Sequence, residues 1–265
     1  MDFATALIPH AVPFALVFAR VTGLFLLTPI LTSGSIPMRV RVMLVVSFAA
    51  ATYPFVPAGV LPDTIGSVWV LGPLLVSELA IGFVLGVFAQ LPLVAVQMAG
   101  YIMGYQMGLA IASAYNPELD TESGVIGQLL FFLAAMVFAL IGGLEILFIA
   151  LATTFETMPI GGFSGWAVPV EPVVDLLHTG FEFALRLSMP IMAVVMLILL
   201  AIGFGAKTMP QLNVMTVGFA LKILAGIGSL AAVAMVLDAE IADELLRVLD
   251  LIFEWASNPL EAGDG

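Results

Sequence analysis

Long stretches without formal charges alternate with short polar or proline-rich segments along most of the chain. Because one crossing of a bilayer needs about 20 apolar residues, such stretches are typical of membrane-spanning helices. The pattern predicts six helices, at residues 7–31, 39–54, 79–117, 123–144 (extending to about 155), 187–206 and 212–237. The segment from Pro159 to about Asp175 is predicted to be a polar loop, because it contains several glycines and prolines. With no internal repeat or low-complexity linker, we expect one all-α membrane domain over residues 1–265.

The C-terminal tail after Asp238 differs from the stretches before it. It is acidic and carries apolar residues at helical spacing, as in Glu240 to Arg247. This pattern favours a solvated amphipathic helix over a segment that contacts other components.

The composition strengthens the membrane assignment. The chain is 62% hydrophobic and 10% charged, whereas a soluble domain is about half apolar and about a quarter charged. The net charge of −12 argues against a nucleic-acid partner, whose phosphates need a basic surface. Cysteine is absent, which excludes disulfides and thiolate chemistry. Residues 1–19 contain no Lys or Arg, so we expect no cleaved secretory signal.

The sequence offers little for catalysis. His10 and His178 lie near segment ends and far apart, and a lone histidine at a helix end is usually solvated or capping; no metal-binding spacing is present. The run Gly203–Thr208 faintly resembles a phosphate-binding loop, but Ala201 and Ala206 occupy the two positions at which such a loop requires glycine. We therefore predict no enzyme activity, no cofactor and no metal.

Charged residues inside apolar stretches are the next candidates, because an ionisable group at bilayer depth is costly and usually functional. They serve either as a proton or substrate relay or as buried pairs between helices or with a partner chain. Pairing is favoured, since two acids and three bases are scattered over five segments and no two acids share a face. The residues are Arg20, Glu78, Glu145, Arg186 and Lys222.

The third apolar stretch is too long for one span and too short for two spans joined by a loop. Its second half repeats a small residue every four positions, which places Gly100, Gly104, Gly108 and Ala112 on one helix face. Ordinary helix packing explains the spacing alone. The surrounding methionines, tyrosines and glutamines, with glycines that weaken a helix by about 1 kcal/mol each, favour instead a pliable segment that plugs a hole and faces protein rather than lipid.

Four segments, in order, resemble signatures of the FliR/SctT family of type III export-gate proteins. Residues 97–117 resemble its Gly/Met segment, and Ile36–Arg41 its Ile-Pro turn followed by basic residues. Thr157–Gly161 resembles its Pro-Ile-Gly turn, and Met209–Val214, with Pro210 and Gln211, its Pro-Gln turn. The chain departs from the family at Asn116 and Leu144, where Asp and His are frequent.

The resemblance implies a non-enzymatic subunit of the export gate in the flagellar basal body, within the bacterial cytoplasmic (inner) membrane. It implies bent helical hairpins in a hetero-oligomer with FliP-like and FliQ-like subunits, an FlhB-like protein at the entrance, and unfolded export substrates in transit. A loop matching about Gln106 to Glu122 would plug the pore. The residues that this carries over are Gln106, Met107, Gly108, Leu109, Ala110, Ile111, Ala112, Ser113, Asn116 and Pro117.

Two other functions are weighed against a flagellar gate. A virulence (injectisome) export gate is the first, and the run Tyr105–Leu109 looks more flagellar than virulence-type. A secondary transporter of a small solute is the second. It would need corresponding broken helices in two related halves, and the third and sixth stretches share no such pattern.

Overall fold

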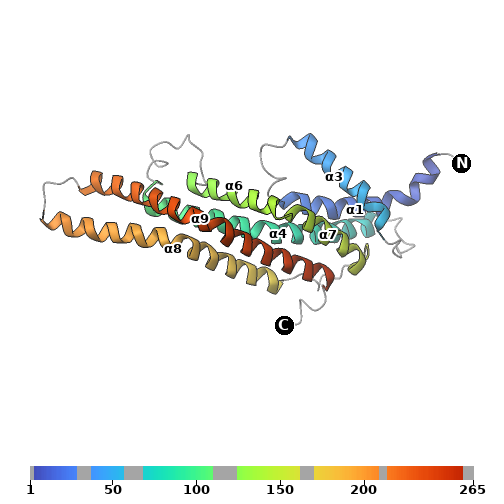
Figure 1. The fold of residues 1–265 in the computed structure, drawn as a ribbon. Coiled ribbons are helices and arrows are strands. Elements are labelled where there is room, and N and C mark those ends of the chain that lie inside the picture. Colours follow the sequence, from blue (N-terminus) through green and yellow to red (C-terminus); the bar gives the residue numbers. More distant parts are fainter. Residues whose placement is uncertain are drawn as a thin grey trace. The chain divides into compact units, whose positions relative to one another are not determined.

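The computed structural model describes residues 3–28, 37–56, 68–109, 124–161, 170–208 and 214–258, and all regular structure in these ranges is helical. The prediction of an all-α protein is therefore confirmed. The elements, labelled in Figure 1 apart from the short 3-10 helix η1, are α1 (Phe3–Leu27), α3 (Met38–Thr52), η1 (Tyr53–Phe55), α4 (Val68–Met107), α6 (Val125–Leu140), α7 (Gly143–Thr157), α8 (Val170–Thr208) and α9 (Val214–Ser257).

Several of the described helices have the length and composition of membrane spans. Three qualify alone, over His10–Leu27, Leu71–Met107 and Glu171–Lys207. Two bent pairs raise the number to at most five if each pair is one span: α6 with α7, and the segments Val217–Val233 and Leu237–Ser257 of α9. The second predicted span forms α3, whose 15 residues are fewer than the about 20 that a crossing needs.

Helix boundaries differ from the predicted ones where charges lie inside a helix. The predicted loop up to Asp175 and the predicted start at Leu187 are both too late, because α8 begins at Val170. Pro172 stands in the first turn, where its missing N–H leaves no helical bond unmade. Likewise, α9 continues from the sixth apolar stretch through the acidic tail to Ser257. Charges end an apolar stretch, but they do not end a helix.

The fourth apolar stretch forms two helices rather than one. Gly142, between α6 and α7, has φ +79°, a left-handed conformation that L side chains rarely adopt. The N–H of Ile141 donates to Val137, and the N–H of Ile146 donates to Gly142. The helical hydrogen bonds therefore continue up to the break on each side, and the glycine supplies the turn.

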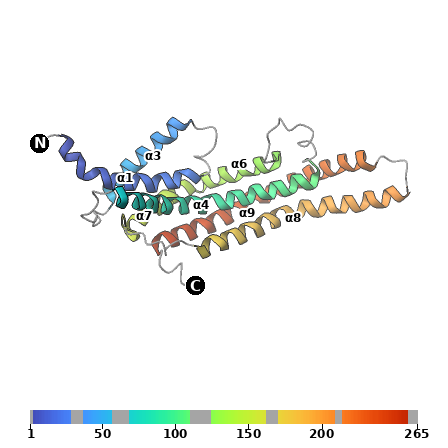
Figure 2. The same ribbon diagram turned by 180° about the vertical axis from the view of Figure 1, so that it is seen from behind.

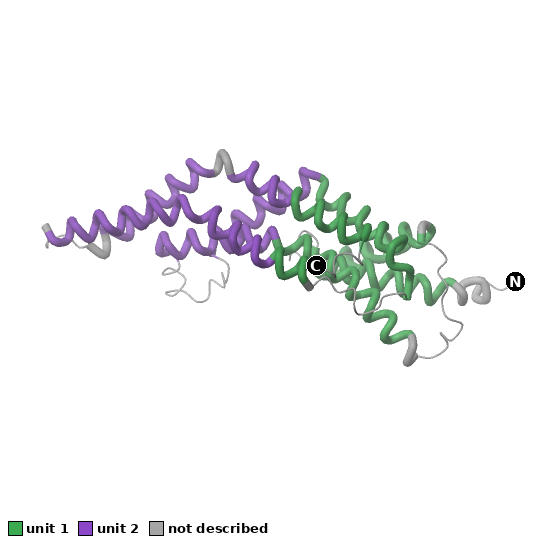
Figure 3. The backbone as a smooth tube through the Cα atoms, turned by 90° about the horizontal axis from the view of Figure 1, so that it is seen from below, with its two compact units in different colours: residues 1–91, 142–176, 246–265 green, residues 92–141, 177–245 purple. Residues whose placement is uncertain are grey.

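The chain forms two compact units, coloured separately in Figure 3. Unit 1 comprises residues 1–91, 142–176 and 246–265, and unit 2 comprises 92–141 and 177–245. In unit 1, α1 and α3 pack against each other (Figure 1 and Figure 2). The rings of Phe48 and Phe148 stack with centroids 4.0 Å apart, and Phe25 lies against both.

Unit 2 contains the second part of α4, α6, most of α8 and the first part of α9. Its core includes Met103, Met107, Phe138 and Ile191, all buried. Along α8, by contrast, many large apolar side chains are exposed, among them Met189, Met196, Leu197, Leu200 and Phe204. An apolar surface of this extent on one chain is typical of a face covered by lipid or by other subunits.

Candidate functional site

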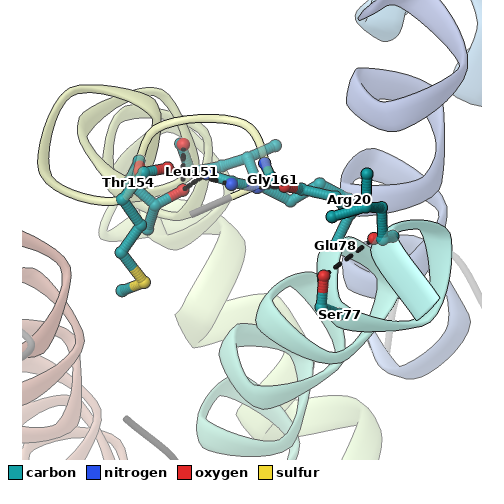
Figure 4. A network of polar contacts seen from close by, with 8 residues as sticks. Arg20, Ser77, Glu78, Leu151, Thr154 and Gly161 are labelled. Carbon is teal, nitrogen blue, oxygen red and sulfur yellow. Dashed lines mark hydrogen bonds and ion pairs between the residues drawn. The ribbon is translucent and has the colours of Figure 1, made fainter. Parts of the chain in front are cut away.

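A buried ion pair joins α1 and α4 in unit 1. Arg20 Nε donates to Glu78 Oε2 over 2.6 Å, and neither side chain is exposed. The same guanidinium reaches the end of α7, where Nη1 donates to the carbonyl of Thr154 at 2.9 Å and to its hydroxyl at 3.1 Å, and Nη2 donates to the carbonyl of Met158 at 3.0 Å (Figure 4). One side chain thus ties together three helices that are distant in the sequence.

The pair completes the polar contacts at the end of α7. The C-terminal carbonyls of a helix carry partial negative charge, so a guanidinium beside the carbonyls of Thr154 and Met158 is well placed; the Thr154 carbonyl also accepts the N–H of Met158. The other Glu78 oxygen, Oε1, accepts the Gly161 N–H at 2.9 Å. The Phe155 ring lies against the guanidinium, with its centroid 4.2 Å from Cζ. Arg20 and Glu78 therefore fix the turn Thr157–Gly161, one of the segments that carry the family resemblance.

The other predicted charges have different surroundings. Arg186 lies 3.4 Å from Glu240, with the two side chains 71% and 42% exposed. Glu145 is exposed and Lys222 is partly buried. Within the described ranges neither of these two residues forms an ion pair. The structure thus pairs Arg20 with Glu78 and Arg186 with Glu240, and Glu240 was not among the five charges predicted to pair.

Two glycines let α1 and α4 approach closely beside the ion pair. A methyl group added at Gly82 would overlap the carbonyl oxygen of Arg20, and one added at Gly23 would overlap that of Leu79. Neither glycine was predicted from the sequence to lie at a helix contact. Gly82 and Gly86 have the four-residue spacing that is typical of close helix contacts. The same spacing defines the glycine stripe of Gly100, Gly104 and Gly108.

The four small residues of the predicted packing face have different surroundings. A Cβ at Gly100 would lie 2.6 Å from the Cα of Gly127, so α4 and α6 cross there in close contact. Nothing lies within 4 Å of a Cβ placed at Gly104. Gly108 has φ +85° and ends the helix, while Ala112 lies outside the described residues.

The end of α4 has the hydrogen bonds of a Schellman motif. The N–H of Leu109 donates to the carbonyl of Gly104, and the N–H of Gly108 donates to that of Tyr105, each over 3.0 Å. The glycine occupies the position that requires a left-handed residue. Met107, just before it, is fully buried, whereas Gln106 is exposed. The predicted plug therefore begins at a fixed helix end.

Part of the predicted site falls on residues that the structure does not describe. These are Ala110, Ile111, Ala112, Ser113, Asn116 and Pro117 of the plug, and Pro210 and Gln211 of the Pro-Gln turn. Of the two histidines, His178 is exposed, and His10 Nδ1 forms a 2.8 Å hydrogen bond with the hydroxyl of Tyr53. No group of three or more potential metal ligands occurs among the described residues.

Comparison with known proteins identifies the family. The family described as "Bacterial export proteins, family 1" matches residues 11–248. The flagellar biosynthetic protein FliR of Escherichia coli K12 is 33% identical over 222 residues, which cover 80% of each chain. FliR of Bacillus subtilis strain 168 is 28% identical over 222 residues, with 79% of this chain and 81% of the relative covered. The Yop proteins translocation protein T of Yersinia pestis is 27% identical over 248 residues, 90% of this chain and 92% of the relative.

The fold and the buried polar contacts define an all-helical protein with several helices suited to a membrane. The family match covers most of this chain, including the Arg20–Glu78 pair, the turn after α7 and the glycine-rich end of α4. The chain belongs to family 1 of the bacterial export proteins.

Proposed function

We propose that this chain is a non-enzymatic subunit of a flagellar type III protein export gate in the bacterial cytoplasmic membrane. In this role it assembles with FliP-like and FliQ-like subunits and an FlhB-like protein around a channel for unfolded substrates. The observation that carries the proposal is the 33% identity to E. coli FliR across 80% of both chains. The exposed apolar face of α8 supports it, because such a surface needs lipid or neighbouring subunits to cover it.

The segment that begins at Gln106 is proposed to plug the channel in the resting gate. The predicted plug extends from there to about Glu122, and its described part ends at Leu109. Two features of that part support the role. The buried Met107 anchors the root of the segment, and Gly108 stops the helix at a defined point. A plug needs such a fixed base, because a loosely held one would not return to the same position after each substrate.

Deletion of the gene tests the first proposal. A strain that lacks the protein should lose flagella and motility, and a plasmid copy should restore both. Purification of a tagged copy should recover FliP-like and FliQ-like chains in one complex. A protein that purifies alone from a motile strain, as a stable monomer, would contradict the proposal.

A short deletion tests the plug. Removal of Met107–Ser113 in a strain that makes the full gate should increase ion leak across the cytoplasmic membrane. Removal of Pro259–Gly265, a segment of equal length at the C-terminus, serves as the control and should leave the leak unchanged. An equal leak in both strains would rule out the plug.

A virulence export gate is the second candidate, and the similarity to the Yersinia pestis protein over 90% of this chain favours it. The same deletion strain separates the two functions. Loss of motility with effector secretion intact supports the flagellar gate, and the reverse result supports the injectisome.

A further inference from the structure

Within unit 2, Met107, at the start of the predicted plug, packs against the backbone of α9 at a glycine. The side chain of Met107, at the end of α4, lies directly over Gly226 of α9. A Cβ at Gly226 would stand 2.5 Å from Cγ, 2.7 Å from Cε and 2.8 Å from Sδ of this methionine. Only a residue without a side chain at position 226 leaves room for Met107 as it lies.

The methionine has little freedom to move aside. Its side chain is fully buried, as is that of Met103 one turn earlier. Close-packed interiors offer few spaces into which a displaced side chain can move. A Cβ at position 226 would overlap Cγ as well as the flexible tip of the methionine, so rotation of the terminal methyl does not relieve the clash.

The position of Met107 sets the end of α4. It immediately precedes Gly108, whose left-handed backbone closes the Schellman motif. The next residue, Leu109, is tied back to Gly104. A shift of Met107 therefore moves the point from which the chain continues toward the rest of the predicted plug.

We propose that Gly226 is a positioning residue of the export gate: it provides the seat for Met107 and so sets the place from which the plug begins. The inference rests on the proposed function, since it assigns to α9 a part in sealing the channel. Gly226 acts through Met107 and touches no substrate.

Gly226→Ala in the full gate tests the seat, with ion leak across the cytoplasmic membrane as the readout. The expected result is a several-fold rise in leak, with normal recovery of the complex. Gly228→Ala is the matched control, because it lies two residues away on the same helix and nothing stands within 4 Å of its Cβ. Equal leak from the two variants overturns the inference.

A second pair of strains asks whether the effect passes through Met107. In a Met107→Ala background the overlap no longer exists, so Gly226→Ala should cause no further leak. Non-additivity of this kind is the mark of two residues in contact. An equal increase from Gly226→Ala in both backgrounds would show a general loss of packing in α9 and overturn the inference.

Cross-linking covers the case in which Gly226→Ala fails to assemble. The chain contains no cysteine, so the double variant Met107→Cys, Gly226→Cys carries only the two introduced thiols. The shorter side chain at position 107 leaves space for the thiol at position 226. Oxidation of membranes with the assembled gate should link the two positions within the chain. Met107→Cys with Gly228→Cys should give far less product. Equal yields from both pairs, or none from the first, would overturn the inference.

The inference and the proposed function fail in different ways. If deletion of Met107–Ser113 leaves the leak unchanged, the plug itself is wrong. If the deletion causes leak while Gly226→Ala behaves as Gly228→Ala does, the plug stands and the seat is wrong.

Discussion

Arg20 and Glu78 form an ion pair across α1 and α4 in which neither side chain is exposed (Figure 4). The carboxylate also accepts the N–H of Gly161, and the guanidinium also donates to Thr154 and Met158. A buried pair stabilises a fold only when its remaining hydrogen-bonding groups are also satisfied. Here each side chain forms further hydrogen bonds. Removal of either charged side chain therefore leaves the other charge buried without its counter-charge.

Glu78→Gln should destabilise the protein by about 3–5 kcal/mol, because the buried guanidinium loses its counter-charge. Thermal unfolding of the purified protein in detergent measures the change. A second substitution, Arg20→Met, should recover part of the loss, since it removes the uncompensated charge. Arg186→Gln is the control: its pair with Glu240 is largely exposed and should contribute at most about 1 kcal/mol.

Gly82→Ala should destabilise unit 1 by about 1–3 kcal/mol, the usual cost of overpacking. The added methyl meets the backbone of Arg20, which cannot move aside as a side chain tip can. Gly72→Ala on the same helix meets nothing within 4 Å and should be neutral or stabilising, because alanine favours the helix. Thermal unfolding of both variants in detergent measures the two changes in stability. A smaller effect at residue 82 than at residue 72 would mean that α1 and α4 do not cross as described.

Gly100→Ala should weaken the contact of α4 with α6 and reduce the amount of assembled gate, because the new Cβ would stand 2.6 Å from the Cα of Gly127. Gly104→Ala, four residues later in the same stripe, should assemble normally, since its Cβ enters open space. The amount of each variant that is recovered with a tagged neighbouring subunit measures the assembly of Gly100→Ala and Gly104→Ala. Equal loss from both would indicate one continuous packing face.

Gly108→Ala should cost about 1–2 kcal/mol, the penalty for an L side chain in a left-handed conformation. Because this residue ends α4, part of the effect should appear as impaired export of a flagellar substrate into the medium. Gly108→Asn should be milder, as asparagine tolerates this conformation better. If alanine and asparagine are equally well tolerated, the Schellman motif is not required for export.

The glycine stripe illustrates what spacing alone can predict. A four-residue repeat placed Gly100, Gly104 and Gly108 on one helix face, and in the structure each has a different role. The first allows a close helix crossing, the second meets nothing within 4 Å, and the third supplies a left-handed turn. The spacing is identical in all three cases, so the difference comes from the neighbouring helix and the end of α4, neither of which the local sequence specifies.

The charged residues give a similar lesson. Hydropathy singled out Arg20 and Glu78, because a charge stands out in an apolar stretch. Hydropathy could not predict that the two residues pair with each other, since they lie on different helices 58 positions apart in the sequence. Gly226 left no signal at all, as its importance depends on Met107 of another helix. Helix ends were misplaced in α8 and α9 because acidic residues interrupt hydropathy without interrupting backbone hydrogen bonds.

The guanidinium of Arg20 also constrains the biogenesis of the protein. Its carboxylate partner follows 58 positions later in the chain, and its carbonyl partners follow 134 and 138 positions later. When the ribosome has made only α1, that helix contains no acidic residue to pair with this cation, and an unpaired guanidinium inside a bilayer is costly. We therefore expect α1 to insert stably only after α4 has been synthesised, and Arg20 can form its hydrogen bonds to Thr154 and Met158 only once α7 has been made. Translation products that stop before Glu78 are expected to remain poorly inserted and to be removed by membrane proteases.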